Sequence, residues 1–67
     1  MAVARVSKIT AASPTSFEAA VEEGLLRASR TLRGITGLNV LEQKASVKDG
    51  KIAEYRVTMD VTFILEG

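Results

Sequence analysis

Acidic side chains are the residues of this chain best suited to chemistry. Four of them fall in the second half of the sequence, in stretches typical of strands: Glu42, Glu54, Asp60 and Glu66. Carboxylate oxygens are hard ligands, which favour Ca²⁺ or Mg²⁺ over zinc. A metal site is therefore one hypothesis. It would be formed by Glu42, Glu54 and Asp60 meeting across a hairpin or a subunit boundary.

Cations on the same hairpin support a competing interpretation. Lys44, Lys51 and Arg56 lie among the acidic residues along the sequence. Cross-strand ion pairs on a solvated sheet face would neutralise the carboxylates without any metal. The sequence favours this structural role over a metal site.

Catalysis is not expected of this chain. With no His and no Cys, it lacks the commonest general base, the best nucleophile and the usual zinc ligands. The hydroxyl groups of Ser13, Thr15 and Ser16 are explained by a turn and a helix start. We therefore predict that the protein is not an enzyme.

The strongest structural pattern lies in the last third of the chain. Lys48-Asp49-Gly50-Lys51 is typical of a two-residue type I′ hairpin turn, because Asp-Gly readily adopts positive φ angles. Strict alternation then covers the eleven residues from Tyr55 to Leu65. The apolar side of this strand comprises Tyr55, Val57, Met59, Val61, Phe63 and Leu65. An antiparallel partner strand must lie directly before the turn.

The size of the chain makes self-association the expected source of stability. Residues 1–67 form a single domain, and 67 residues without cysteine are close to the size at which one core is marginal. A strand of roughly 35 Å is too long for one helix to cover its apolar face. We therefore expect other subunits to bury the excess.

A helix is predicted between Ser13 and Gly34. Its start leaves two alternatives: Ser13 as the cap with Pro14 in the first turn, or a capping box of Thr15 and Glu18. Apolar residues then recur at helical spacing: Phe17, Ala20, Val21, Gly24, Leu25, Ala28 and Leu32. Gly34 is expected to end the helix. Gly24 in the stripe indicates close packing on a sheet.

The other strands complete the predicted fold. Ala2–Thr10 forms the first strand, without showing which of its faces is buried. Ile35–Val47 forms the second, and its apolar side changes parity between Val40 and Leu41, which predicts a β-bulge. The expected fold is α+β, in the order β-α-β-β, with a three-stranded antiparallel sheet curved around one helix.

Charge and hydropathy exclude two classes of partner. Nine basic and eight acidic residues give a net charge of +1, which is too low to favour electrostatic binding to nucleic acid. No apolar run is as long as a membrane span, and no signal-peptide pattern is present. We expect a cytoplasmic protein that binds neither nucleic acid nor membranes.

Five segments, taken in order and spacing, carry a family resemblance: S-P-T-S-F-E-A-A, R-A-S-R-T-L-R, N-V-L-E-Q-K, D-G-K and E-Y-R-V-T-M-D-V-T-F-I-L-E. Together they resemble the dodecin family over nearly the whole chain. The resemblance implies small β-α-β-β subunits that assemble as hollow homododecamers. It also implies flavin binding, for storage or sequestration rather than turnover.

The resemblance also identifies ligand positions, and here the chain departs from the flavin binders. Gly37 aligns with the Trp on which those dodecins stack the flavin ring, and Arg56 aligns with a Gln that hydrogen-bonds the ring. Ile64 stands where some relatives carry an Arg that contacts coenzyme A. Glu42 matches an acidic position near the flavin pocket. The chain is more similar to a Trp-less branch that includes calcium dodecins, which raises calcium as a cofactor.

The sequence therefore predicts a non-enzymatic, dodecin-like homo-oligomer whose flavin site is weakened or lost. One alternative is a storage protein that binds FMN, riboflavin or another small ligand in a modified intersubunit pocket at Gly37, Glu42 and Arg56. Another is an interaction module that pairs its exposed strand edge with a partner protein.

Overall fold

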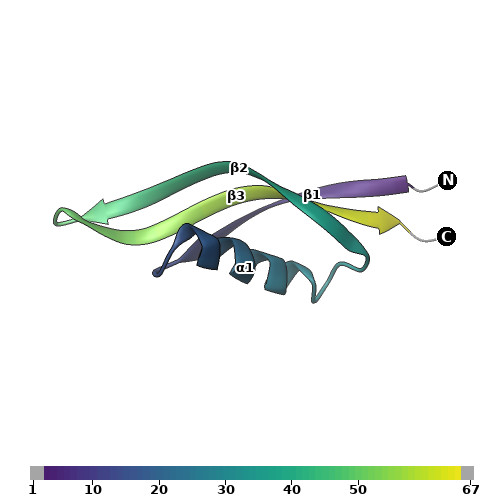
Figure 1. Cartoon of the computed structure of the whole chain (residues 1–67), viewed down its shortest axis with the longest axis horizontal. Helices are drawn as coiled ribbons and strands as arrows, with labels where there is room; N and C mark the ends of the chain where they lie inside the picture. The colour runs from purple at the N-terminus through teal and green to yellow at the C-terminus, as the bar shows by residue number, and fades with distance from the viewer. Residues whose placement is uncertain (1–2, 66–67) are drawn as a thin grey trace.

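A computed structural model describes residues 3–65 and arranges them as one helix against a three-stranded antiparallel sheet (Figure 1). The elements are β1 (Val3–Ser13), α1 (Phe17–Ala28), β2 (Ile35–Lys48) and β3 (Lys51–Leu65). The spatial order β1-β3-β2 places β3 in the centre and leaves β1 and β2 at the edges. The predicted β-α-β-β fold, with a sheet curved around one helix, is confirmed.

The alternation predicted for β3 is confirmed by burial. Val57, Met59 and Val61 are the largest fully buried side chains, and they form the core together with the small residues of α1. β1 pairs with β3 without a break, from Val3↔Leu65 to Ser13↔Tyr55. This register shows which side of β1 faces the helix, because partners across an antiparallel ladder share a face. Ile9 and Ala11 are on the buried side.

The start of the helix corrects both predicted caps. β1 runs to Ser13 instead of ending at Thr10, because pairing with β3 continues to Tyr55; Ala2 lies outside the described residues. Ser13 is therefore still in the strand, and its Oγ accepts a hydrogen bond from the Thr15 N–H at 3.0 Å, as in a turn. The cap is Ser16, whose Oγ accepts from the Ala19 N–H at 2.9 Å.

The helix also ends earlier than predicted, at Ala28 and not near Gly34. Ser29 caps the helix, and the amides of Arg30 and Thr31 then donate three residues back, to the carbonyls of Arg27 and Ala28 at 3.2 and 3.1 Å, as in a turn. Gly34 lies six residues further on, with φ +70°. It reverses the chain so that Ile35 pairs with Phe63. The position of this reversal is set by pairing in the sheet, so the helical spacing of apolar residues could not predict it.

The hairpin prediction is confirmed in detail. Asp49 and Gly50 have φ angles of 53° and 74°, as a type I′ turn requires. β2 extends one residue beyond the prediction, to Lys48, which pairs with Lys51. The predicted bulge is present as a register shift between Val40 and Glu42, which leaves Leu41 as the extra residue. Two further shifts make β2 the irregular edge of the sheet.

Gly24 allows the close approach of α1 to the sheet. A Cβ at this position would collide with the terminal methyl of buried Met59 and would lie 3.0 Å from the Ala11 Cβ. The Met59 methyl could swing aside only into a filled core, and the Ala11 Cβ is fixed to its strand. Close packing is thus the reason for the glycine, as the sequence indicated.

Replacing Gly24 with Ala should lower the free energy of unfolding by about 1 kcal/mol. Overpacking costs about 2 kcal/mol, and the gain in helix propensity offsets about 1 kcal/mol of it. Denaturant unfolding at equal protein concentrations measures the change. Glu22→Ala, at an exposed helix position, is the control and should leave stability within ~0.5 kcal/mol. A higher denaturation midpoint for Gly24→Ala would contradict the packing argument.

Candidate ligand-binding face

The candidate site residues share one face of the sheet, the face turned away from α1. On β3 this polar face comprises Glu54, Arg56, Thr58, Asp60 and Thr62, which alternate with the buried residues. The register adds their partners from β2, because Gly37 pairs with Thr62, Glu42 with Thr58 and Lys44 with Arg56. Folding therefore brings every predicted ligand position to the same side.

One subunit does not bring the three predicted ligand positions into a single site. Gly37 lies opposite Thr62 of β3, whereas Arg56 is six residues before Thr62 on the same strand. At about 3.3 Å per residue these positions are roughly 20 Å apart. Glu42 is closer to Arg56, because its partner Thr58 is only two residues away. A small ligand could therefore contact both Gly37 and Arg56 only if the two residues came from different subunits.

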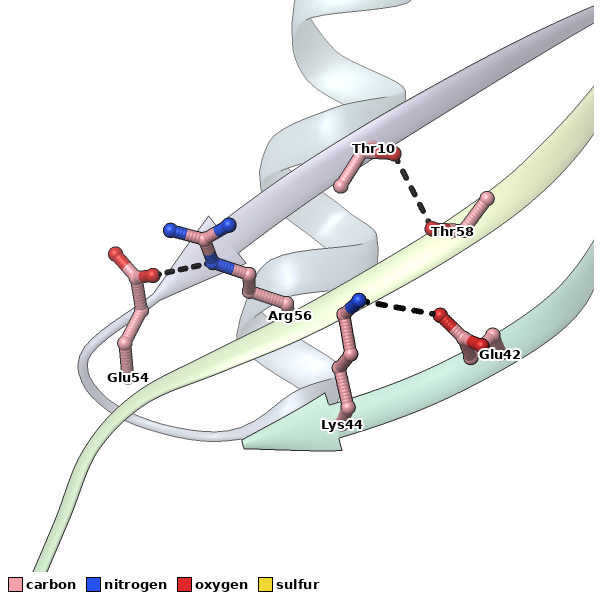
Figure 2. Close-up of polar contacts among 6 residues, drawn as sticks. All are labelled: Thr10, Glu42, Lys44, Glu54, Arg56 and Thr58. Atoms are coloured by element: carbon pink, nitrogen blue, oxygen red, sulfur yellow. Dashed lines mark hydrogen bonds and ion pairs between the residues drawn. The ribbon is translucent and has the colours of Figure 1, made fainter. Parts of the chain in front are cut away.

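Ion pairs hold two of the predicted carboxylates (Figure 2). Glu54 Oε1 accepts from Arg56 Nε at 2.6 Å, and Glu42 Oε1 lies 3.6 Å from Lys44 Nζ. All four side chains are more than one-third exposed, so each pair contributes only a few tenths of a kcal/mol. Lys44 and Arg56 are themselves register partners, and the adjacent acids offset their repulsion.

The three predicted metal ligands do not converge within one chain. Among residues 3–65, no group of three acidic side chains is placed to hold a metal ion. Asp60 pairs in register with Lys8 on β1 and Asn39 on β2, and Glu66 lies outside the described residues. The metal site stays a prediction, and it would need carboxylates from more than one subunit.

Space is available at Gly37. A Cβ built on Gly37 meets no atom within 4 Å, so the position is open where a side chain would begin. Beside it is a hollow of about 510 Å³ between the end of α1 and the start of β2, lined by apolar residues that include Leu25, Leu32, Ile35 and Leu38. Residue patterns along the chain did not predict this hollow. Its only signal was the pair of apolar stretches that flank Gly34.

The aromatic residues lie on the other side of the sheet. Phe17 and Tyr55 pack edge to face, with ring centroids 5.0 Å apart and planes at 79°. Tyr55 belongs to the alternating set that faces α1 and is partly buried there. No Trp is present in the chain. The polar face of a single subunit therefore has no aromatic ring on which a flavin could stack.

Comparison with known proteins decides the family. The family model of the dodecins matches residues 3–66. The chain belongs to the dodecin family. It is 32% identical to the dodecin of Thermus thermophilus over 88% of this chain and 86% of that protein. It is 35% identical to the calcium dodecin of Mycobacterium tuberculosis over 94% of this chain and 89% of that protein.

Solved structures agree with this assignment. The dodecin from Streptomyces davaonensis superposes with a TM-score of 0.94 at 36% identity, covering 98% of this chain and 97% of that one. The calcium dodecin of Mycobacterium tuberculosis, described as having a novel calcium-binding site, superposes with a TM-score of 0.82 at 37% identity, covering 96% and 91%. Dodecins are non-enzymatic small-ligand-binding proteins and form homo-oligomers. Within residues 3–65, no helix is long and apolar enough to cross a membrane.

Calcium titration of chelator-treated protein tests the carboxylates of the polar face. If carboxylates from several subunits form a site, calorimetry should give saturable binding that is lost in Glu42→Gln and in Asp60→Asn. Lys44→Gln is the control, because it frees Glu42 from its ion pair without removing a carboxylate. Weak binding that fades with salt and ignores both acidic substitutions would contradict a site and leave only screened surface charge.

Proposed function

We propose that this dodecin is a cytoplasmic, non-enzymatic assembly of twelve single-domain subunits that stores or sequesters a small ligand, and that its flavin site is weakened. The observation that carries the proposal is Gly37. A backbone that matches a dodecin over 98% of the chain leaves open space where the flavin-stacking Trp is expected. The fold is kept while the contact that would select a flavin ring is missing.

The surface of the isolated subunit supports assembly. A folded monomer of 7.2 kDa should expose roughly 4,100 Å², whereas this subunit exposes 4979 Å². Its radius of gyration is 13.8 Å, against roughly 11 Å for a compact chain of this length. Large apolar side chains contribute to the excess, among them Val47 at 66% and Val3 at 61% exposed. Burial against other subunits would remove this surface from water.

A second candidate ligand is calcium. The chain is similar to the calcium dodecin of Mycobacterium tuberculosis both in sequence, at 35% identity, and in structure, at 37% identity over the superposed residues. Glu42, Glu54 and Asp60 supply oxygen donors on the polar face, but two of them are already paired with cations. Calcium would have to compete with these cations, so we rank it below an organic ligand.

Flavin should bind this protein at least tenfold more weakly than a Trp-bearing dodecin. Stacking on an aromatic ring is worth about 1–3 kcal/mol, and the loss of 1.4 kcal/mol is already tenfold in affinity. Quenching of riboflavin or FMN fluorescence on titration with protein measures the affinity for the flavin. Gly37→Trp with Arg56→Gln should recover at least tenfold.

Gly37→Leu with Arg56→Gln is the matched control, because it adds bulk without an indole ring and should recover little. Strong quenching by the unmodified protein would show that another platform binds the ring. No gain from the Trp variant would contradict the alignment of Gly37 with the stacking position.

Sedimentation velocity near neutral pH should find a large, stable homo-oligomer of about twelve subunits. Val61 is fully buried, so Val61→Asp should unfold or dissociate it by placing an unpaired charge in an apolar core. Lys48→Asp changes the charge by more, but at the exposed end of β2 beside the turn, and should leave the oligomer intact. A folded monomer of the unmodified protein at micromolar concentration would overturn the assembly proposal.

A further inference from the structure

The tip of the hairpin between β2 and β3 carries a carboxyl group beside an unhindered backbone nitrogen. The side chains of Asp and Asn can close a succinimide ring on the next amide nitrogen, and the chain has three such residues: Asn39, Asp49 and Asp60. Asn39 and Asp60 are each followed by a valine in a paired strand. Asp49 is followed by Gly50, and both are exposed in the turn. Of the three positions, the tip is therefore the one open to this reaction.

The nitrogen of Gly50 is free to act as a nucleophile. The β2–β3 ladder closes with Lys48 and Lys51, so within residues 3–65 the Gly50 N–H has no backbone partner. A Cβ built on Gly50 meets no atom within 4 Å, so the space around this nitrogen is open. The nitrogen that follows Asp60 is in the opposite situation, because Val61 is fully buried and lies in the central strand.

The geometry of the turn accommodates a succinimide ring. A bond from the Gly50 nitrogen to the Asp49 Cγ holds ψ of Asp49 at about −120°, the value at the first central position of a type II′ turn. That position also needs a positive φ, and Asp49 already has φ 53°. Type I′ and type II′ turns both close two-residue hairpins, and glycine adopts the φ that either requires. Ring closure therefore needs the rotation of one peptide plane and keeps Lys48 paired with Lys51.

We propose that Asp49 is a site of spontaneous succinimide formation, which converts it to isoaspartate in the folded protein. The Gly50 nitrogen attacks the Asp49 Cγ, and the amide proton leaves with the carboxyl hydroxyl group as one water molecule. A second water molecule then opens the ring. Attack at Cγ restores aspartate, whereas attack at the main-chain carbonyl carbon routes the backbone through Cβ and Cγ and frees the main-chain carboxylate. The reaction needs no oxidant, metal or other reactant.

The product alters the tip of the hairpin and leaves the core intact. Isoaspartate adds one atom to the backbone between Lys48 and Lys51, so the two-residue turn lengthens and the last pair of the ladder opens. The tip lies beyond the end of α1 (Figure 1), and Val57, the first buried residue of β3, comes six residues after Lys51. This inference goes beyond ligand storage and does not depend on it.

The product also has a recognisable chemistry. The carboxylate freed from the main chain of an isoaspartyl residue is the group that carboxyl methyltransferases esterify with S-adenosylmethionine. Exposure of Asp49 and Gly50 leaves this group accessible at the tip. A methyltransferase of this class is therefore the partner that the modified hairpin fits.

Incubation of the intact protein in water enriched in heavy oxygen tests the reaction near neutral pH. Each cycle of ring closure and opening brings one oxygen atom from water into residue 49. Mass spectrometry should therefore find the label in the peptide that contains Asp49 and not in the peptide that contains Asp60. An endoprotease that cuts before aspartate, but not before isoaspartate, should lose its cut at Asp49 and keep its cut at Asp60. A purified isoaspartyl methyltransferase should transfer no more than one methyl group per chain.

Two variants change the chemistry at the same position. Asp49→Asn keeps a pair that favours the type I′ turn, and its amide carbon is attacked more readily than that of a carboxylate. Label should enter this variant at least tenfold faster, which corresponds to a barrier lower by about 1.4 kcal/mol. Asp49→Glu keeps the negative charge but would need a larger ring, so it is the matched control and should take up no label.

Unfolding the chain in urea measures what the fold contributes. The folded protein should react within about tenfold of the unfolded chain, because the turn has to rotate only one peptide plane. A folded rate more than about a hundredfold lower would overturn the inference, since the hairpin would then protect the pair. Equal labelling of Asp49 and Asp60 would overturn it as well, because the reaction would then occur in unfolded molecules. Label in Asp49→Glu would show that the oxygen enters by another route.

Discussion

The structure depends on a mismatch of length between one strand and one helix. β3 has 15 residues and extends roughly 50 Å, whereas α1 has 12 residues and extends about 18 Å. The helix can cover only the middle of the apolar face, where Val57, Met59 and Val61 are fully buried. Beyond it the strands continue without a second layer (Figure 1). A subunit of this shape is complete as a fold but not as a buried core.

The same mismatch explains why the packing of α1 is so tight. A short helix stabilises the sheet only if it lies close to it, and the buried positions of α1 are Ala20, Gly24 and Ala28. These small residues let Met59 and the inner side of β1 fill the space under the helix. The cost is that the buried positions of the helix carry no large apolar side chain. Burial by other subunits is the remaining source of stabilisation for such a chain.

The two faces of the sheet have different roles. The face toward α1 holds the core and the Phe17–Tyr55 contact, and it specifies the fold. The opposite face carries the carboxylates, the cations and the open position at Gly37, and within residues 3–65 none of these belongs to the buried core. This separation lets ligand preference change while the fold stays the same. It is consistent with a family whose members resemble this chain closely in structure at only 30–37% identity.

Features that depend on neighbouring residues could be predicted from residue types and spacing. The type I′ turn at Asp49-Gly50, the buried side of β3 and the bulge at Leu41 followed from local backbone preference and a period of two.

Where the elements end, and what they face, depends on pairing between distant parts of the chain. β1 continues to Ser13 because Tyr55 is there to pair with it, and Ser16 becomes the helix cap as a result. The chain leaves the helix at Ala28 so that Ile35 can reach Phe63. The predicted ligand positions share a face but do not meet within one chain for the same reason: register is set by long-range pairing, which no local pattern contains.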